Sequence, residues 1–263
     1  MTPVALPQEE IVDLHNEIVA LEIDNAKKIA TLEQLLWRTQ KLLLKSPRDV
    51  RVLITAAMAY MKLGKQKKAK EQFLKAFNLR VAQNLSITDR INLLTSANHL
   101  FLTKEIEILL EELFLLLHNE QHEKNIYAKN ILGALLLLGR WNDFYDMAQE
   151  IQLEDITPFT CTNSHPIISE VLKNHMGIIQ SHIQDIVCGT GFFLIVDEGV
   201  PSIVVRLWLA CNFYDSLSIS DKCHDDLDEY DNSIGIKISS LPYDITPIFS
   251  IIPVFHFEPA LCQ

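Results

Sequence analysis

The segment 50–83 constrains the fold more than any other part of this sequence. Within its 34 residues, small and aromatic side chains recur at three- and four-residue spacing on two stretches separated by a glycine. Such spacing predicts two helices packed as an antiparallel hairpin, with the glycine ending the first helix. A single hairpin cannot bury its apolar face, so further hairpins are expected beside it. The residues that carry the pattern are Leu53, Ala57, Tyr60, Gly64, Ala69, Phe73 and Ala76.

This pattern resembles a tetratricopeptide repeat (TPR). It departs from the family at Val81, where the family usually has proline, although Pro47 holds the equivalent place one repeat earlier. Gly139 repeats the role of Gly64 after 75 residues, which is near two repeat lengths plus a short insertion. An irregular helical bundle with one chance match is the alternative.

Weaker helical periodicity surrounds this segment. One amphipathic helix is predicted from Glu9 and a second over about residues 30–44. Two more pairs of helices are predicted at 88–118 and 125–152. The resemblance therefore implies an all-α, TPR-like solenoid of about four helical hairpins over residues 1–153.

The resemblance also implies a protein-binding surface. In this family, the first helix of each repeat lines a concave groove that binds peptides or helices of partner proteins. Members that clamp a C-terminal carboxylate place Lys and Asn where this chain has Ile54 and Met58. An adaptable apolar partner segment is expected instead, unless both side chains simply pack against the preceding hairpin. The groove positions implied here are Arg51, Ile54, Met58, Met61 and Lys62.

Charge and composition divide the chain in two. Residues 1–153 hold 19 acidic and 19 basic side chains, whereas residues 154–263 hold 15 acidic and 4 basic ones, which is the whole net charge of −11. Downstream of 153, residues favoured in strands replace the Leu, Lys, Glu and Ala of the first part. We therefore predict an acidic α+β domain at 154–263, joined to the helical domain near 157–164.

The second domain is predicted to begin with a helix that runs to about Val187 and to continue as strands. Most of the strands are expected to join one antiparallel sheet. An acidic loop at 221–231 is expected between the second strand and the third. It lacks the central glycine of a calcium loop, so Asp225, Asp226 and Asp228 are candidates for contacting a basic partner surface. The predicted strands are 191–196, 203–213, 234–239 and 249–257.

Catalytic and metal-binding patterns are not recognisable. There is no GxSxG, HExxH or Walker pattern, and the five cysteines include no CxxC. His175 and His182 are seven residues apart on one predicted helix, but two histidines without a third ligand make a weak metal site. We predict no catalytic residue, no metal and no cofactor.

These features favour a non-catalytic interaction module or adaptor that binds a protein segment in the groove. The negative charge argues against nucleic acid, and the absence of a long apolar stretch argues against a membrane span and a leader peptide, so a cytoplasmic protein is expected. One alternative is a chaperone or immunity-type protein that masks a secreted or basic partner. The other is an enzyme or ligand sensor in the C-terminal domain.

Overall fold

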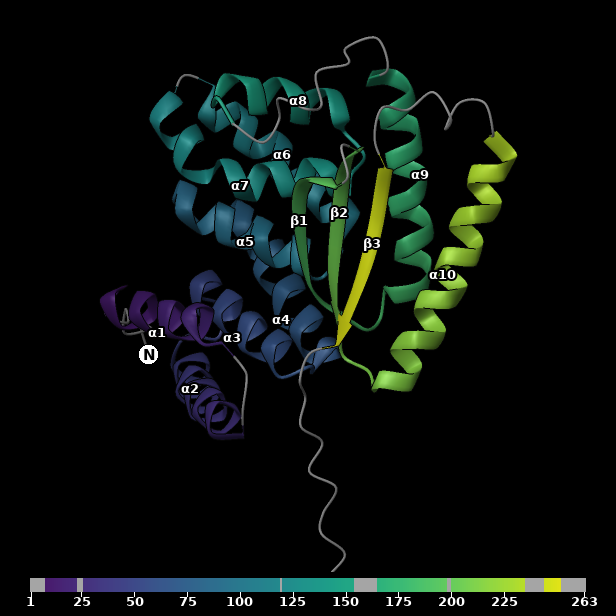
Figure 1. The fold of residues 1–263 in the computed structure, drawn as a ribbon. Coiled ribbons are helices and arrows are strands. Elements are labelled where there is room, and N and C mark those ends of the chain that lie inside the picture. Colours follow the sequence, from purple (N-terminus) through teal and green to yellow (C-terminus); the bar gives the residue numbers. More distant parts are fainter. Residues whose placement is uncertain are drawn as a thin grey trace, which may run out of the picture.

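The computed structural model describes residues 8–22, 26–118, 120–153, 165–197, 200–234 and 244–251. Its class is α+β: it is mostly helical, with a small sheet (Figure 1). The predicted joint at 157–164 lies outside the described residues. None of the helices in the described ranges is long and apolar enough to cross a membrane. The N-terminal helices are α1 (Gln8–Ala20), α2 (Ala26–Lys45), α3 (Val50–Lys62), α4 (Gln66–Leu79), α5 (Ile87–His99), α6 (Thr103–Leu117), α7 (Gln121–Leu137) and α8 (Trp141–Glu150), with a 3₁₀ turn at Arg80–Ala82.

Three helix pairs, α3–α4, α5–α6 and α7–α8, are joined by the same tight turn. The second residue after each first helix has a left-handed backbone, with φ of 66° at Gly64, 53° at Phe101 and 66° at Gly139. The next residue donates its N–H five positions back, as from Lys65 to the Tyr60 carbonyl at 2.9 Å. The turns are 37 and 38 residues apart. Phe101 therefore occupies the place of Gly64 in the middle pair, and the expected insertion between the glycines is spread evenly over two units.

The predicted hairpin at 50–83 forms as two packed helices. Ala57 in α3 and Ala69 in α4 are fully buried, so the two backbones approach closely, and Phe73 fills the adjoining space. Asp49 begins α3 by accepting a hydrogen bond from the backbone N–H of Arg51. Nearly every residue of α3 is buried, because helices on several sides cover it.

The C-terminal part consists of two helices and a three-stranded sheet with the strand order β1-β2-β3. β1 and β2 form an antiparallel hairpin, as predicted, with Phe192 opposite Val205. β3 runs parallel to β2, with Ile203 opposite Ile245, so the sheet is mixed. The predicted antiparallel pairing is confirmed for β1 and β2 and does not extend to β3. The elements are α9 (His165–Ile183), β1 (Val187–Asp197), β2 (Val200–Leu209), α10 (Phe213–Ile234) and β3 (Asp244–Ile251).

The correction at β3 has its cause in α10. The segment 221–231, predicted as an acidic loop, lies within this helix. Asn212 begins the helix by accepting the backbone N–H of Asp215 at 2.8 Å. Because a helix crosses between β2 and β3, the chain returns to the same end of the sheet and the next strand pairs in parallel. The predicted strand at 203–213 accordingly ends at Leu209, and most of the one predicted at 234–239 lies outside the described residues.

The sheet packs against the helical pairs. β1 lies beside α5, α3 and α7, and β3 lies on the side of α10 (Figure 1). The residues of β1 and β2 that face the helices include Ile203, Val205 and Leu207, all fully buried. The buried apolar side chains form one continuous cluster from Ile11 in α1 to Leu227 in α10. The inner helices α3, α5 and α7 therefore support both the N-terminal helix and the sheet.

Candidate functional site

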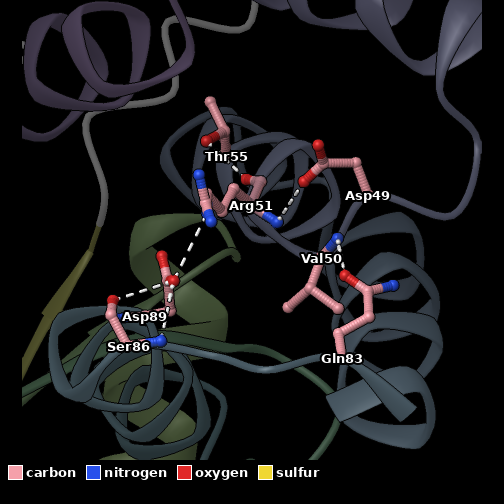
Figure 2. Close-up of polar contacts among 7 residues, drawn as sticks. All are labelled: Asp49, Val50, Arg51, Thr55, Gln83, Ser86 and Asp89. Atoms are coloured by element: carbon pink, nitrogen blue, oxygen red, sulfur yellow. Dashed lines mark hydrogen bonds and ion pairs between the residues drawn. The ribbon is translucent and has the colours of Figure 1, made fainter. Parts of the chain in front are cut away.

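Arg51, the first of the implied groove positions, lies in a polar cluster between α3 and α5 (Figure 2). Its Nε donates to Asp89 Oδ2 at 3.3 Å. The same carboxylate oxygen accepts the Ser86 hydroxyl at 2.8 Å and the backbone N–H of Ser86 at 3.2 Å. The Ser86 hydroxyl oxygen in turn accepts the backbone N–H of Asp89 at 3.1 Å, which completes the capping box that begins α5. The Thr55 hydroxyl donates back to the Arg51 carbonyl at 2.8 Å. Arg51 thus joins two inner helices rather than presenting a free cation.

Helix α1 closes this end of the inner surface. Lys62 donates through Nζ to the carbonyls of Val19 and Leu21 at the end of α1, at 2.7 and 2.8 Å. His15 in α1 lies 3.2 Å from the Thr55 hydroxyl through Nδ1, and burial lowers its pKa. What remains between α1, α3 and α5 is a cavity of about 90 Å³ that Arg51 helps to line. This space is too small for a peptide.

The apolar groove positions are buried by the chain itself. The exposed fractions of Ile54, Met58 and Met61 are 2%, 5% and 1%. Ile54 lines the small cavity beside Arg51, and all three belong to the continuous core. The structure therefore buries the three apolar groove positions on α3, while Arg51 and Lys62 are half-buried and bonded to α5 and to the end of α1.

The acidic candidates lie elsewhere, on α10, at the opposite side of the molecule from α3 (Figure 1). All three are exposed, and Asp226 also lies 2.8 Å from His182 Nε2 on α9. Two turns of α9 away from this pair and toward its start, His175 Nε2 is 2.7 Å from Asp231. The acidic residues thus hold α10 against α9, and the two histidines share one face of α9.

A much larger open space with mainly apolar walls lies between α5, α7 and the outer edge of β1. It has a volume of about 590 Å³. Sequence reasoning missed this cavity, because its walls come from segments about 35 to 100 residues apart that only the fold brings together. Its lining consists of Thr95, Asn98, His99, Lys129, Asn130, Leu132, Gly133, Leu136, Phe144, Leu153 and residues 190–195.

Polar side chains cross the inner surface of α5 and α7. Asn130 donates to the Thr95 hydroxyl at 2.7 Å, and the Asn98 amide donates to the Asn130 carbonyl at 3.2 Å. The Asn98 side-chain oxygen is buried and has no hydrogen-bond partner within the described chain. One sequence signal could have found this surface: Thr95 and His99 lie one helical turn apart on α5, and both line the cavity.

One edge of β1 borders the cavity. All six consecutive residues from Thr190 to Ile195 line it, so the cavity follows the strand rather than one of its faces. The backbone N–H of Thr190 donates away from β2, to His99 Nδ1 at 3.2 Å. Phe192 and Leu194 have the same alternation and direct their backbone groups the same way. On that side, neither has a hydrogen-bond partner in the described part of the chain.

His99 holds the end of this edge. Burial and the charge of Lys62 lower the pKa of His99 to about 4, so the ring is neutral at pH 7. A neutral ring that accepts at Nδ1 carries its proton on Nε2. Lys129 is the charged group in the cavity lining, and no described residue forms an ion pair with it.

The cysteines and the carboxylates of the described residues lie outside the lining of this cavity. No group of three or more His, Cys, Asp or Glu among the described residues could hold a metal ion. Burial raises the pKa of Cys188 and of Cys223 to about 12, so both are protonated thiols at neutral pH. What the cavity can do is bind: apolar walls surround a few amides, one ammonium group and a strand edge.

Comparison with known proteins finds no matching family model, no matching curated protein and no matching solved structure. The function must therefore be argued from the geometry of the cavity between α5, α7 and β1.

Proposed function

We propose that this protein is a non-catalytic interaction module that binds a segment of a partner protein in the cavity between α5, α7 and β1. The observation that carries the proposal is the cavity itself, about 590 Å³ with mainly apolar walls and a few convergent polar groups. The implied groove on α3 is not the site in this proposal, because α1 and the core already cover those residues.

The TPR resemblance supports a scaffold of this kind. Three helix pairs share one turn geometry at intervals of 37 and 38 residues. The first helix of each pair, α3, α5 or α7, belongs to the inner surface, which is where the resemblance implies that partners bind. In this proposal, the protein uses the α5–α7 part of that surface for its partner and the α3 part for its own α1.

Filling the cavity tests the proposal. Gly133 lies in α7, and a Cβ there would have the Phe192 ring at 3.6 Å as its nearest neighbour, an ordinary contact. In Gly133→Leu, the side chain would project beside Phe192 into the space meant for the partner. Gly177→Leu in α9 is the matched control, since a Cβ there meets nothing within 4 Å and Gly177 lines a different cavity. Both changes replace a helix glycine and should raise helix stability by about 1 kcal/mol each.

The probe is a phage-displayed library of random 12-residue peptides selected on the full chain. We expect selected peptides to bind Gly177→Leu normally and Gly133→Leu at least about tenfold more weakly, a loss of about 1.4 kcal/mol. Urea unfolding of both variants should show undiminished stability. Equal binding to both variants, or no peptide selected at all, would overturn the proposal.

A further inference from the structure

Resting on the proposed function, we propose that the partner segment binds as an added β-strand along the outer edge of β1, with a carboxylate of the segment paired to Lys129. The partner is thus an extended peptide with alternating apolar residues and one acidic group. The inference adds the binding mode and the chemistry of the occupant to the site already proposed.

The register of the hairpin identifies which backbone groups are available. Asp197 pairs with Val200 across a two-residue loop, so the odd-numbered residues of β1 beyond the bulge exchange hydrogen bonds with β2. The even-numbered ones face the cavity, as the bond from Thr190 to His99 shows directly. Beyond Thr190, the backbone N–H and carbonyl groups of Phe192 and Leu194 are available for a second ladder.

The surroundings define where this ladder begins. At Thr190 the edge is closed, because His99 accepts the backbone N–H and the Thr190 hydroxyl donates to the Asn98 carbonyl at 3.2 Å. From Phe192 onward the edge borders the cavity. An incoming strand therefore starts next to His99 and runs toward the hairpin loop, which leaves room for about four residues at about 3.3 Å each.

An added strand would have an apolar environment on both faces. Side chains on its inner face would contact the cavity wall that includes Leu132, Leu136 and Phe144. Those on its outer face lie next to Phe193 and Ile195, which are 46% and 43% exposed. Cross-strand apolar pairs of this kind stabilise a sheet, so alternate residues on both faces of the peptide are expected to be apolar.

The charge of the cavity lining indicates which polar group the partner segment carries. The protein has a net charge of −11, yet none of the described residues that line this cavity carries a carboxylate, and the charged group among them is the ammonium of Lys129. Lys129 forms no ion pair within the described ranges. A carboxylate on the segment meets a local positive charge there. The buried acceptor of Asn98 adds a place for an N–H donor of the segment.

The test uses the library-selected peptides and full chain labelled with ¹⁵N. On peptide binding, the amides of Phe192 and Leu194 should become at least tenfold slower in hydrogen exchange, while the amide of Phe193 is already protected by β2. N-methylation of the peptide, one residue at a time, should abolish binding at alternate positions. Lys129→Glu should weaken the binding of acidic peptides by about fivefold. The control is Lys67→Glu, at an exposed lysine on α4, which should leave binding unchanged.

The outcomes separate the two proposals. One outcome would overturn strand addition but leave the proposed binding module in place. In it, peptides fail to bind Gly133→Leu, yet they tolerate every N-methyl group and leave amide hydrogen exchange at Phe192 and Leu194 unchanged. Binding indifferent to Gly133→Leu overturns both. If the free chain elutes as a dimer with the Phe192 and Leu194 amides already protected, a second copy occupies the edge and the proposed partner is wrong.

Discussion

The two ends of the inner helical surface differ in what occupies them. Over α3, helix α1 leaves a cavity of about 90 Å³, and the polar groups there pair with one another, as Arg51 does with Asp89. Over α5 and α7, about 590 Å³ stays open and a strand edge and a lysine lack partners in the described chain. At one end of the scaffold the polar groups have hydrogen-bond partners, and at the other end several of them have none within the described chain. Exposure of unsatisfied groups, rather than resemblance to a repeat, locates the candidate site.

The largest expected effect concerns the wall that carries the open end. Gly139 has φ of 66°, and a Cβ there would lie 2.5 Å from the Lys173 backbone in α9. Gly139→Ala must therefore displace α9, and we expect a loss of about 2–4 kcal/mol in the free energy of unfolding. Urea titration measures it.

Two glycine controls sharpen this result. Gly64→Ala has the same left-handed strain at φ 66°, so the excess loss in Gly139→Ala reports the contact with α9. Gly177→Ala, with open space at its Cβ, should gain up to about 1 kcal/mol. Equal losses at Gly139 and Gly64 would show that α9 does not rest on the α7–α8 turn.

The next effect tests the point at which β1 is tied to α5. The folded-state pKa of His99 is lowered to about 4, below its unfolded value near 6.5. The unfolded chain then binds more protons between these values, so stability is complete above pH 6.5 and falls as the pH drops toward 4. The loss should reach about 3 kcal/mol, and a protonated ring can no longer accept the Thr190 N–H.

His99→Gln is the matched variant, because it keeps an acceptor and cannot titrate. Urea unfolding at a series of pH values should show a shallower decline for the variant than for the natural chain. Parallel curves would mean that His99 is not buried in its neutral form and that the closed end of the β1 edge is held differently.

The smallest effect concerns the satisfied end. Lys62→Met removes the donor to the Val19 and Leu21 carbonyls, a change of about 1 kcal/mol. Amide exchange in α1 should accelerate by about fivefold while α5 and α7 stay unchanged. Lys65→Met, at an exposed lysine three residues on, is the control. If exchange in α1 does not change, other contacts of α1 hold the helix over α3.

The helical pairs were predictable because their pattern is local. Leu53, Ala57 and Tyr60 reveal one face of α3, and Gly64 reveals its end, without reference to the rest of the chain. The turn between α5 and α6 was not predictable, because Phe101 adopts a left-handed backbone that non-glycine residues rarely take. Its cost is offset by full burial of the ring and by a hydrogen bond from Gln180 to the Phe101 carbonyl, contacts that no local pattern contains.

The errors have a common physical cause. In α10, the density of acidic residues suggested a solvated loop and obscured the buried stripe of Ser216, Cys223 and Leu227 that packs the helix. On α3, the spacing of the residues identified the face expected to bind a partner, but it did not show that the protein's own core would bury that face. The open cavity depends on α5, α7 and β1 meeting in space, so its residues could not be grouped from the sequence.

The free edge of β1 also bears on how the protein behaves at high concentration. An unpaired strand edge flanked by exposed Phe193 and Ile195 is a template on which identical molecules can join edge to edge. The net charge of −11 opposes this, because like-charged copies repel one another. More than half of that charge lies on α10, whose seven acidic residues outnumber its single lysine. The acidic helix α10 therefore supplies much of the charge repulsion that opposes association of molecules through the free edge of β1.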